Sequence, residues 1–279
     1  MSYTGIKEIV CKTDEDYIQV YEYSETLKLL TNEYLLVKNT DGQVVDKKRW
    51  DGTSLQALRY RSLESRYVDK IKPRSPEQEC YFDLLQNQDI VGKLVQGGFG
   101  SGKSFLAMAH SIEWVFGNKP KYNKIVFIRN MQLVKELGNH SLGALPGLLH
   151  EKIKPFAMQF ADFTGSESEL DGMIASEKLS LDYLGFCRGR SYTNSCIYLN
   201  ESENISKDQM ALIMSRVGEG SCLIVDGDMN QVDRDLYAGN NSGMKRMIEK
   251  LQGNSLFGMV TLQKNERSEF SSLSDLLLE

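Results

Sequence analysis

The 279-residue sequence lacks the features that would direct it to a membrane or out of the cell. No stretch approaches the ~18 consecutive apolar residues that a membrane-spanning helix needs. The first eight residues include no apolar segment of the kind found in secretory signals. We therefore expect a cytoplasmic chain with no membrane partner.

Cysteine is scarce and unpaired. The five cysteines are odd in number, are scattered along the chain and form no C-x-x-C pair; they are Cys11, Cys80, Cys187, Cys196 and Cys222. This pattern excludes a disulfide framework and a zinc site. We expect reduced thiols, most of them in the core.

An excess of positive charge is also missing. The formal net charge of −5 means that any nucleic-acid site would have to be a local basic patch. Internal repeats, low-complexity tracts and heptad seams are absent as well. The 41% hydrophobic content suffices for a sizeable core, so a globular enzyme of one large domain, or one large and one small, is the default expectation.

One motif stands out among what is present. Residues 97–104 fit the phosphate-loop pattern G-x-x-x-x-G-K-S/T, between a strand-like run at 90–96 and helix formers at 104–112. The loop predicts a nucleoside triphosphate site in which Lys103 neutralises β/γ-phosphate charge and the Ser104 hydroxyl reaches Mg²⁺. The predicted nucleotide-binding residues are Gly97, Gly98, Phe99, Gly100, Ser101, Gly102, Lys103 and Ser104. Phe99 is unusual, because a small residue is expected at its place.

The first 70 residues differ from the rest in their pattern of apolar and polar residues. Residues 16–23 alternate at period two and predict a strand, and the turn at 39–42 predicts a hairpin. We expect a small β-rich unit over 1–70. The prolines at 73 and 76 mark the boundary with a second domain, 71–279.

The remainder alternates strands and helices, which predicts an α/β fold with a mostly parallel sheet covered by helices and a ligand at the carboxyl ends of the strands. The expected buried strands are 90–96, 124–128, 195–199, 221–225 and 257–262. The expected helices are 103–116, 146–161, 207–217 and 241–252.

Two of these strands end in polar clusters. After 195–199 come Asn200 and Glu201, where P-loop ATPases hold a Mg²⁺-supporting aspartate and a glutamate that orients or deprotonates water. Glu201 can act as base, whereas Asn200 offers only a neutral carbonyl to the metal. After 221–225, Asp228 and Gln231 could sense the γ-phosphate and its water. A solvated loop after Asn200 and turn chemistry around Asp228 are the alternatives.

Gln78 has two interpretations. With Ser75 as N-cap and Pro76 at the first helical position, it completes a capping box. Alternatively, its amide pairs with the adenine edge. Arginines near strand or helix ends could stabilise the transferred phosphoryl group from a neighbouring subunit; they are Arg129, Arg188, Arg190, Arg216 and Arg267.

Together these strings resemble the PhoH-like family of P-loop ATPases over roughly residues 72–279. The resemblance is carried by residues 73–78, the phosphate loop, 128–130, 142–147, 151–156, 188–190, 200–201, 215–218, 227–233 and 266–267. It implies a RecA-like domain related to the first motor lobe of superfamily 1 helicases. It also implies a cytoplasmic ATPase that is linked to RNA metabolism and forms rings.

This chain departs from the family pattern at three positions: Asn200 stands in place of Asp, Glu203 in place of the usual Gln, and Phe99 in place of a small residue. The first departure bears on the rate of hydrolysis more than on binding. The 70 residues before the ATPase part are too short for the PIN ribonuclease domain of fused members, so no nuclease activity is expected.

The sequence therefore predicts an oligomeric ATP hydrolase that uses ATP and Mg²⁺ and acts on or with RNA or single-stranded DNA. Arg267, then Arg216, are the candidates for the contact from a neighbouring subunit. A helicase is the alternative, although only about 46 residues follow Asp233, too few for a second motor lobe. A nucleotide-dependent scaffold with little turnover would explain Asn200. A small-molecule kinase fits the loop alone.

Overall fold

The computed structural model describes residues 3–65, 67–129, 154–155, 157–184, 187–233 and 235–263. The chain forms two compact units. The first unit comprises Met1–Ser62, Lys72–Phe105 and Met247–Glu279, and the second comprises Leu63–Ile71 and Leu106–Arg246. The predicted division at residue 70 stays a prediction.

A six-stranded parallel sheet with helices on its faces confirms the predicted α/β class. Its strand order is β10-β5-β9-β8-β6-β7. The strands are β5 Gly92–Gly97, β6 Lys124–Arg129, β7 Leu179–Tyr183, β8 Ser195–Asn200, β9 Cys222–Gly227 and β10 Phe257–Leu262. Five of them were predicted, and β7 was not. Strands β5 and β10 belong to the first unit, and β6 to β9 to the second.

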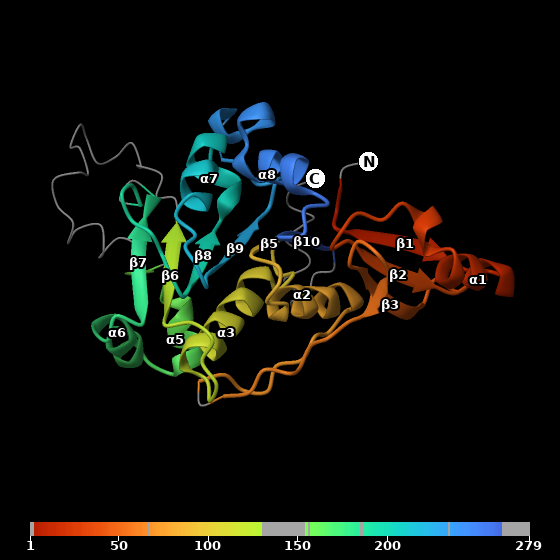
Figure 1. The fold of residues 1–279 in the computed structure, drawn as a ribbon. Coiled ribbons are helices and arrows are strands. Elements are labelled where there is room, and N and C mark those ends of the chain that lie inside the picture. The colour runs from red at the N-terminus through yellow and green to blue at the C-terminus, as the bar shows by residue number, and fades with distance from the viewer. Residues whose placement is uncertain are drawn as a thin grey trace, which may run out of the picture. The chain divides into compact units, whose positions relative to one another are not determined.

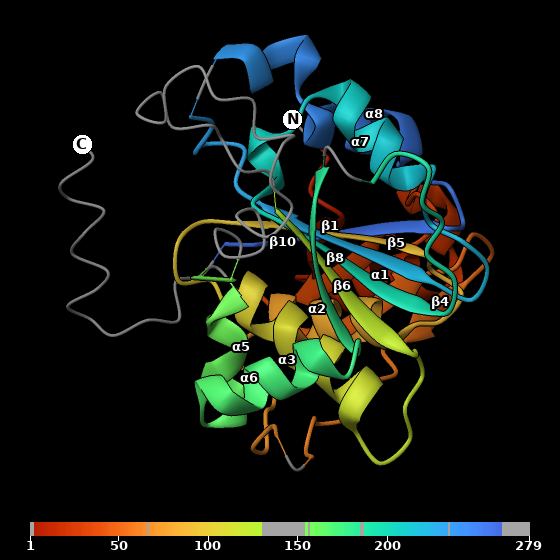
Figure 2. The ribbon, with the colours of Figure 1, turned by 90° about the vertical axis from the view of Figure 1, so that its left-hand side faces the viewer.

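Helices lie between most of these strands along the chain. They are α2 Pro76–Gln86, α3 Lys103–Phe116, α5 Gln159–Thr164, α6 Glu167–Ala175, α7 Lys207–Met214 and α8 Gly243–Leu251. In the second unit, α5 and α6 lie on one side of the sheet and α7 lies on the other (Figure 2). The predicted helix at 146–161 falls largely outside the described residues.

Coverage on both faces explains why the strands of the second unit read as continuous apolar runs. Every residue of β8 is buried, and so are the four central residues of β6. The rings of Phe127 on β6 and Phe160 on α5 meet edge to face, with centroids 5.6 Å apart. The Phe127 ring also packs against Tyr198 of β8, with centroids 5.6 Å apart, so α5, β6 and β8 share one aromatic cluster.

A second, four-stranded sheet lies in the first unit. Its order is β1-β2-β3-β4, with strands Ile6–Val10, Tyr34–Lys38, Val44–Trp50 and Leu55–Ala57 (Figure 1). Strands β2 and β3 are antiparallel and flank the turn at 39–42, which confirms the predicted hairpin. Strands β1 and β2 are parallel.

The segment between β1 and β2 corrects one prediction. Residues 16–23 were expected to form a strand, but Asp14–Glu22 is helix α1. Thr13 caps this helix and forms a capping box with Asp16, and acidic residues fill its first turn. Because Tyr17 and Val20 are three residues apart, both reach the same apolar cluster from one helix face. The cap and this spacing outweigh the period-two pattern.

Helix α2 is tied to the small sheet by one buried carboxylate. Asp83 accepts hydrogen bonds from the Tyr34 hydroxyl at 2.9 Å and from the Arg59 backbone N–H at 2.6 Å, and the Arg49 guanidinium lies 3.3 Å away. Burial raises the pKa of the Asp83 carboxyl, although these partners oppose the rise. The contact is structural and joins parts of the first unit.

All five cysteines are free thiols and all are buried, as predicted. In the described part of the chain, no helix combines the length and the apolar character needed to cross a bilayer.

Candidate functional site: a phosphate loop and a buried carboxylate network

The phosphate loop lies in the first unit, between β5 and the first turn of α3. Strand β5 ends at Gly97 and helix α3 begins at Lys103, so the loop leads directly into the helix N-terminus. Gly100 and Gly102 have φ angles of 75° and 87°, which other residues rarely adopt. The strand, glycine loop and helix predicted from the sequence are therefore present in the order that phosphate binding requires.

Two side chains of the loop region contact the same backbone carbonyl group. The Ser101 hydroxyl donates to the Gly98 carbonyl oxygen at 2.9 Å, and the Lys103 ammonium reaches the same oxygen at 3.3 Å. A neutral carbonyl is a weak partner for an ammonium group, and phosphate oxygens would be stronger acceptors. The loop is therefore suited to bind a polyphosphate. The Lys103 side chain lies against the loop backbone at Gly98, and Ser104 lies in the first turn of α3.

Gln78 supports this loop from α2. The side chain is buried; its Nε2 donates to the Ser101 carbonyl at 3.1 Å and its Oε1 accepts from the Arg74 backbone N–H at 2.9 Å. The Ser75 hydroxyl accepts from the Gln78 backbone N–H, so half of the predicted capping box is present. The pairing of Gln78 with adenine stays a prediction, and both amide ends have protein partners here.

Two phenylalanines beside the loop face outward. Phe99 within the loop is 54% exposed and Phe105 in the first turn of α3 is 51% exposed. About half of the large side chain at position 99 is therefore exposed to solvent.

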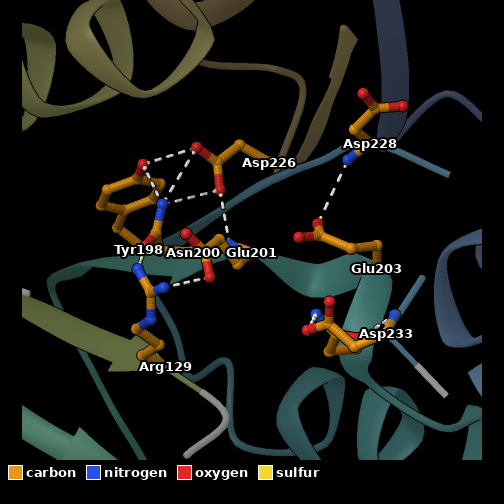
Figure 3. A network of polar contacts seen from close by, with 9 residues as sticks. Arg129, Tyr198, Asn200, Glu201, Glu203, Asp226, Asp228 and Asp233 are labelled. Atoms are coloured by element: carbon orange, nitrogen blue, oxygen red, sulfur yellow. Dashed lines mark hydrogen bonds and ion pairs between the residues drawn. The ribbon is translucent and has the colours of Figure 1, made fainter. Parts of the chain in front are cut away.

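The second group of predicted residues lies in the second unit, at the carboxyl ends of β8 and β9 (Figure 3). Asn200 is buried and uses both ends of its amide. Its Oδ1 accepts from Arg129 Nη1 at 2.7 Å, and its Nδ2 donates to the two carboxylate oxygens of Asp226 at 3.1 and 3.2 Å. The oxygen that could face a metal is thus shared with an arginine.

Glu201 is held in an unusual backbone conformation. Its φ of 52° places it in the left-handed region, where a non-glycine residue is strained. Its backbone N–H donates to Asp226 Oδ1 at 3.0 Å, and its carboxylate pairs with Arg129. The side chain is 46% exposed and can meet solvent, as a base that activates water must.

Asp228 and Gln231 contact each other directly. Gln231 Nε2 donates to Asp228 Oδ2 at 2.7 Å, and the Asn230 backbone N–H donates to the other oxygen at 2.9 Å. The Asp228 backbone N–H donates in turn to Glu203 Oε2 at 3.1 Å. Burial, with smaller contributions from Asp226 and Glu201, raises the pKa of Glu203 to about 7, against the hydrogen bonds that lower it.

A further pair fixes the segment that follows Asp228. The Asn204 amide donates to the Asp233 carboxylate at 2.8 Å and accepts from the Asp233 backbone N–H at 3.0 Å. Residues 228–233 are thereby attached at both ends to the turn after β8.

The remaining predicted residues lie elsewhere. Arg216, after α7, donates to Ser215 Oγ and to the Arg190 carbonyl. Arg267 and the strings at 142–147 and 151–153 lie outside the described residues. The described residues also hold no cluster of three or more His, Cys, Asp or Glu side chains suited to a metal ion.

Sequence reasoning missed two members of the network and considered a third only for another role. Asp226 and Tyr198 were not singled out, and Arg129 was only one of five arginines considered for a contact between subunits. A carboxylate inside the apolar run 222–227 was the available signal, since a buried charge requires partners. The partners themselves depend on strand order, which the sequence does not state.

The comparisons with known proteins identify the family of the chain. A family model described as PhoH-like protein matches residues 70–271. The chain is 33% identical over 217 residues to Protein PhoH2 of Mycolicibacterium smegmatis, covering 77% of this chain and 48% of that protein. It is 28% identical over 260 residues to Protein PhoH2 of Bacillus subtilis, covering 88% and 56%. This chain thus spans about half the length of these relatives.

Proposed function

Because the chain belongs to the PhoH-like family, whose members are generally nucleotide-binding ATPases, we propose that it binds ATP and hydrolyses it. The observation that supports this proposal most strongly is the phosphate loop. Two of its glycines have left-handed φ angles, and the Lys103 ammonium lies against the Gly98 carbonyl. The loop accounts for binding, and Glu201 accounts for hydrolysis.

Each residue has a defined role in this proposal. Lys103 and the loop N–H groups bind the β- and γ-phosphates, and Gln78 holds the loop through Ser101. Mg²⁺, held by the Ser104 hydroxyl, would neutralise charge on the phosphate oxygens. Glu201 accepts a proton from the attacking water, and Arg129 orients its carboxylate.

Asp228 and Gln231 act as a second pair. The Gln231 amide is oriented by its bond to Asp228, so its remaining hydrogen and its oxygen can contact the water or the γ-phosphate. Water rather than a metabolite is the acceptor in this proposal, which separates the protein from a small-molecule kinase.

The ATPase is also expected to have partners. We propose that the ATPase works as an oligomer with RNA or single-stranded DNA, and that Arg267 or Arg216 of a neighbouring subunit completes the site. A nucleotide-dependent scaffold with little turnover is the second candidate, and the neutral Asn200 favours it.

The test compares ATP binding and phosphate release in the wild type and in Lys103→Ala. Loss of the ammonium should weaken ATP binding on the order of 100-fold, because charge-assisted hydrogen bonds to phosphate are lost. Lys119→Ala, which removes an exposed lysine after α3, is the matched control and should bind normally. Unchanged ATP affinity in Lys103→Ala would show that the loop is not part of the ATP site.

The same assay separates the candidates. Phosphate release that rises on addition of single-stranded RNA or DNA supports the nucleic-acid-linked ATPase. ATP binding with negligible release under every condition supports the scaffold.

A further inference from the structure

The carboxylate of Asp226 lies outside the predicted site residues and accepts hydrogen bonds from three of its neighbours. The residue is fully buried near the end of β9. Its carboxylate accepts from the Tyr198 hydroxyl at 2.7 Å, from the Asn200 amide, and from the Glu201 backbone N–H at 3.0 Å. All three donors come from β8 or the residue directly after it, so Asp226 binds the end of one strand from the end of its neighbour (Figure 3).

This arrangement works only if residue 200 is an amide. The Asn200 Nδ2 lies 3.1 and 3.2 Å from the two Asp226 oxygens and donates to this carboxylate, and it also donates to the Tyr198 hydroxyl oxygen at 3.1 Å. An aspartate at position 200 would have no hydrogen to donate, and two carboxylates would face each other at that distance in a buried place. Asn200 and Asp226 are therefore complementary halves of one carboxylate–amide pair.

We propose that Asp226 has taken over the negative charge that P-loop ATPases carry at position 200, and that it acts as a positioning residue for Asn200 and Glu201. This inference rests on the proposed ATPase function. The carboxylate has moved from the end of β8 to the end of β9, and the amide keeps the two strand ends joined.

The positioning reaches the base through its backbone. The bond from the Glu201 N–H to Asp226 stabilises the strained left-handed conformation of Glu201. On the other side, Asn200 Oδ1 and the Glu201 carboxylate share the Arg129 guanidinium. Loss of the Asp226 charge would therefore disturb the backbone and the side chain of the base together.

The test is a charge-exchange cycle of Asn200→Asp, Asp226→Asn and the double variant. Each is measured by melting of the nucleotide-free protein, by ATP affinity, and by turnover as a function of Mg²⁺ concentration. Each single change should lower turnover about 10- to 100-fold, as loss of an outer-shell partner commonly does. The double variant restores one carboxylate and one amide, and should recover turnover to within about threefold of the wild type.

Asp83→Asn is the matched control. Asp83 is also a buried carboxylate that accepts from a tyrosine hydroxyl and a backbone N–H, but it lies in the first unit and joins α2 to the small sheet. It should lower the melting temperature without changing the turnover of the folded protein, and Asn200→Asp should not rescue it.

The outcomes are distinct. Recovery in the double variant, or an Asn200→Asp chain that folds only when Asp226→Asn is added, supports the inference. Additive losses, an unfolded double variant, or an Asn200→Asp protein with unchanged melting and turnover overturns it. A wild type that releases no phosphate refutes the proposed function instead, while the melting cycle still decides whether the two residues form one pair.

Discussion

Among single residues, Glu203 shows most clearly how burial controls the chemistry of the strand ends. Its pKa of about 7 lies well above the usual 4.5, first because the side chain is buried and then because Asp226 and Glu201 are nearby. Below about pH 4.5 the carboxyl is protonated both folded and unfolded, so no cost arises. As the pH rises through 7, the folded protein must ionise a buried group, and stability is lost.

The loss of stability at high pH should disappear in Glu203→Gln. Glutamine, the usual family residue, keeps an oxygen for the Asp228 N–H but has no charge to bury. The variant should be more stable than the wild type at pH 8, by on the order of 2 kcal/mol, and nearly equal at pH 4.5. Melting curves at the two pH values measure the difference. Glu219→Gln, at an exposed glutamate of the same unit, should change neither curve, and an equal gain at both pH values would refute the burial argument.

At the scale of elements, the sequence predicted best what depends on local pattern. The buried strands and α3 were found because continuous apolar runs and helix formers flank an unmistakable glycine loop. Strand β7 was missed because it lies at the end of the sheet order, and its short run over 179–183 mixes buried and half-buried residues. Helix α1 was misassigned because the Thr13 cap was overlooked.

The functional site was predictable only in part, because the sequence reveals local patterns but not which strands are neighbours. Lys103, Glu201 and Asp228 follow strands or open a helix, and their positions could be inferred from the chain alone. The bond between Asn200 and Asp226 links residues 26 apart and requires β8 and β9 to be neighbours. Pairing of that kind follows from sheet order, which a single sequence does not reveal.

The contact between α2 and the phosphate loop yields a prediction at this scale. If Gln78 acts through Ser101, Gln78→Ala should loosen the loop and weaken ATP and GTP to a similar extent, by about tenfold for the lost buried hydrogen bonds. If Gln78 instead contacts adenine, the variant should weaken ATP alone and lose its preference over GTP. Competition binding with both nucleotides distinguishes the two roles. Gln86→Ala, at the other end of α2, serves as control.

At the scale of the whole molecule, the account concerns assembly. The relatives that share the family are longer proteins, of which this chain spans 48% to 63%. We propose that the subunits form a ring, in which a head-to-tail interface would bring an arginine of one subunit to the nucleotide of the next.

Mixing two inactive variants tests this assembly. Arg267→Ala should bind ATP nearly normally and hydrolyse it slowly, whereas Lys103→Ala should bind ATP on the order of 100-fold more weakly. When the two are mixed, one kind of interface holds both an intact loop and an intact arginine, so part of the activity should return. Arg216→Ala is examined in the same way as the second candidate. A mixture no more active than its components, or a monomer with full turnover, would exclude a shared site.

The central claim, that this protein hydrolyses ATP with Glu201 as base, is tested most directly by comparing ATP affinity and turnover in Glu201→Gln. The amide keeps the size of the side chain but cannot take a proton from water. We predict that ATP affinity stays within about threefold of the wild type while turnover falls at least ~100-fold, the usual contribution of a positioned base. Turnover equal to that of the wild type would contradict the assignment of Glu201 and leave Asp228 as the next candidate.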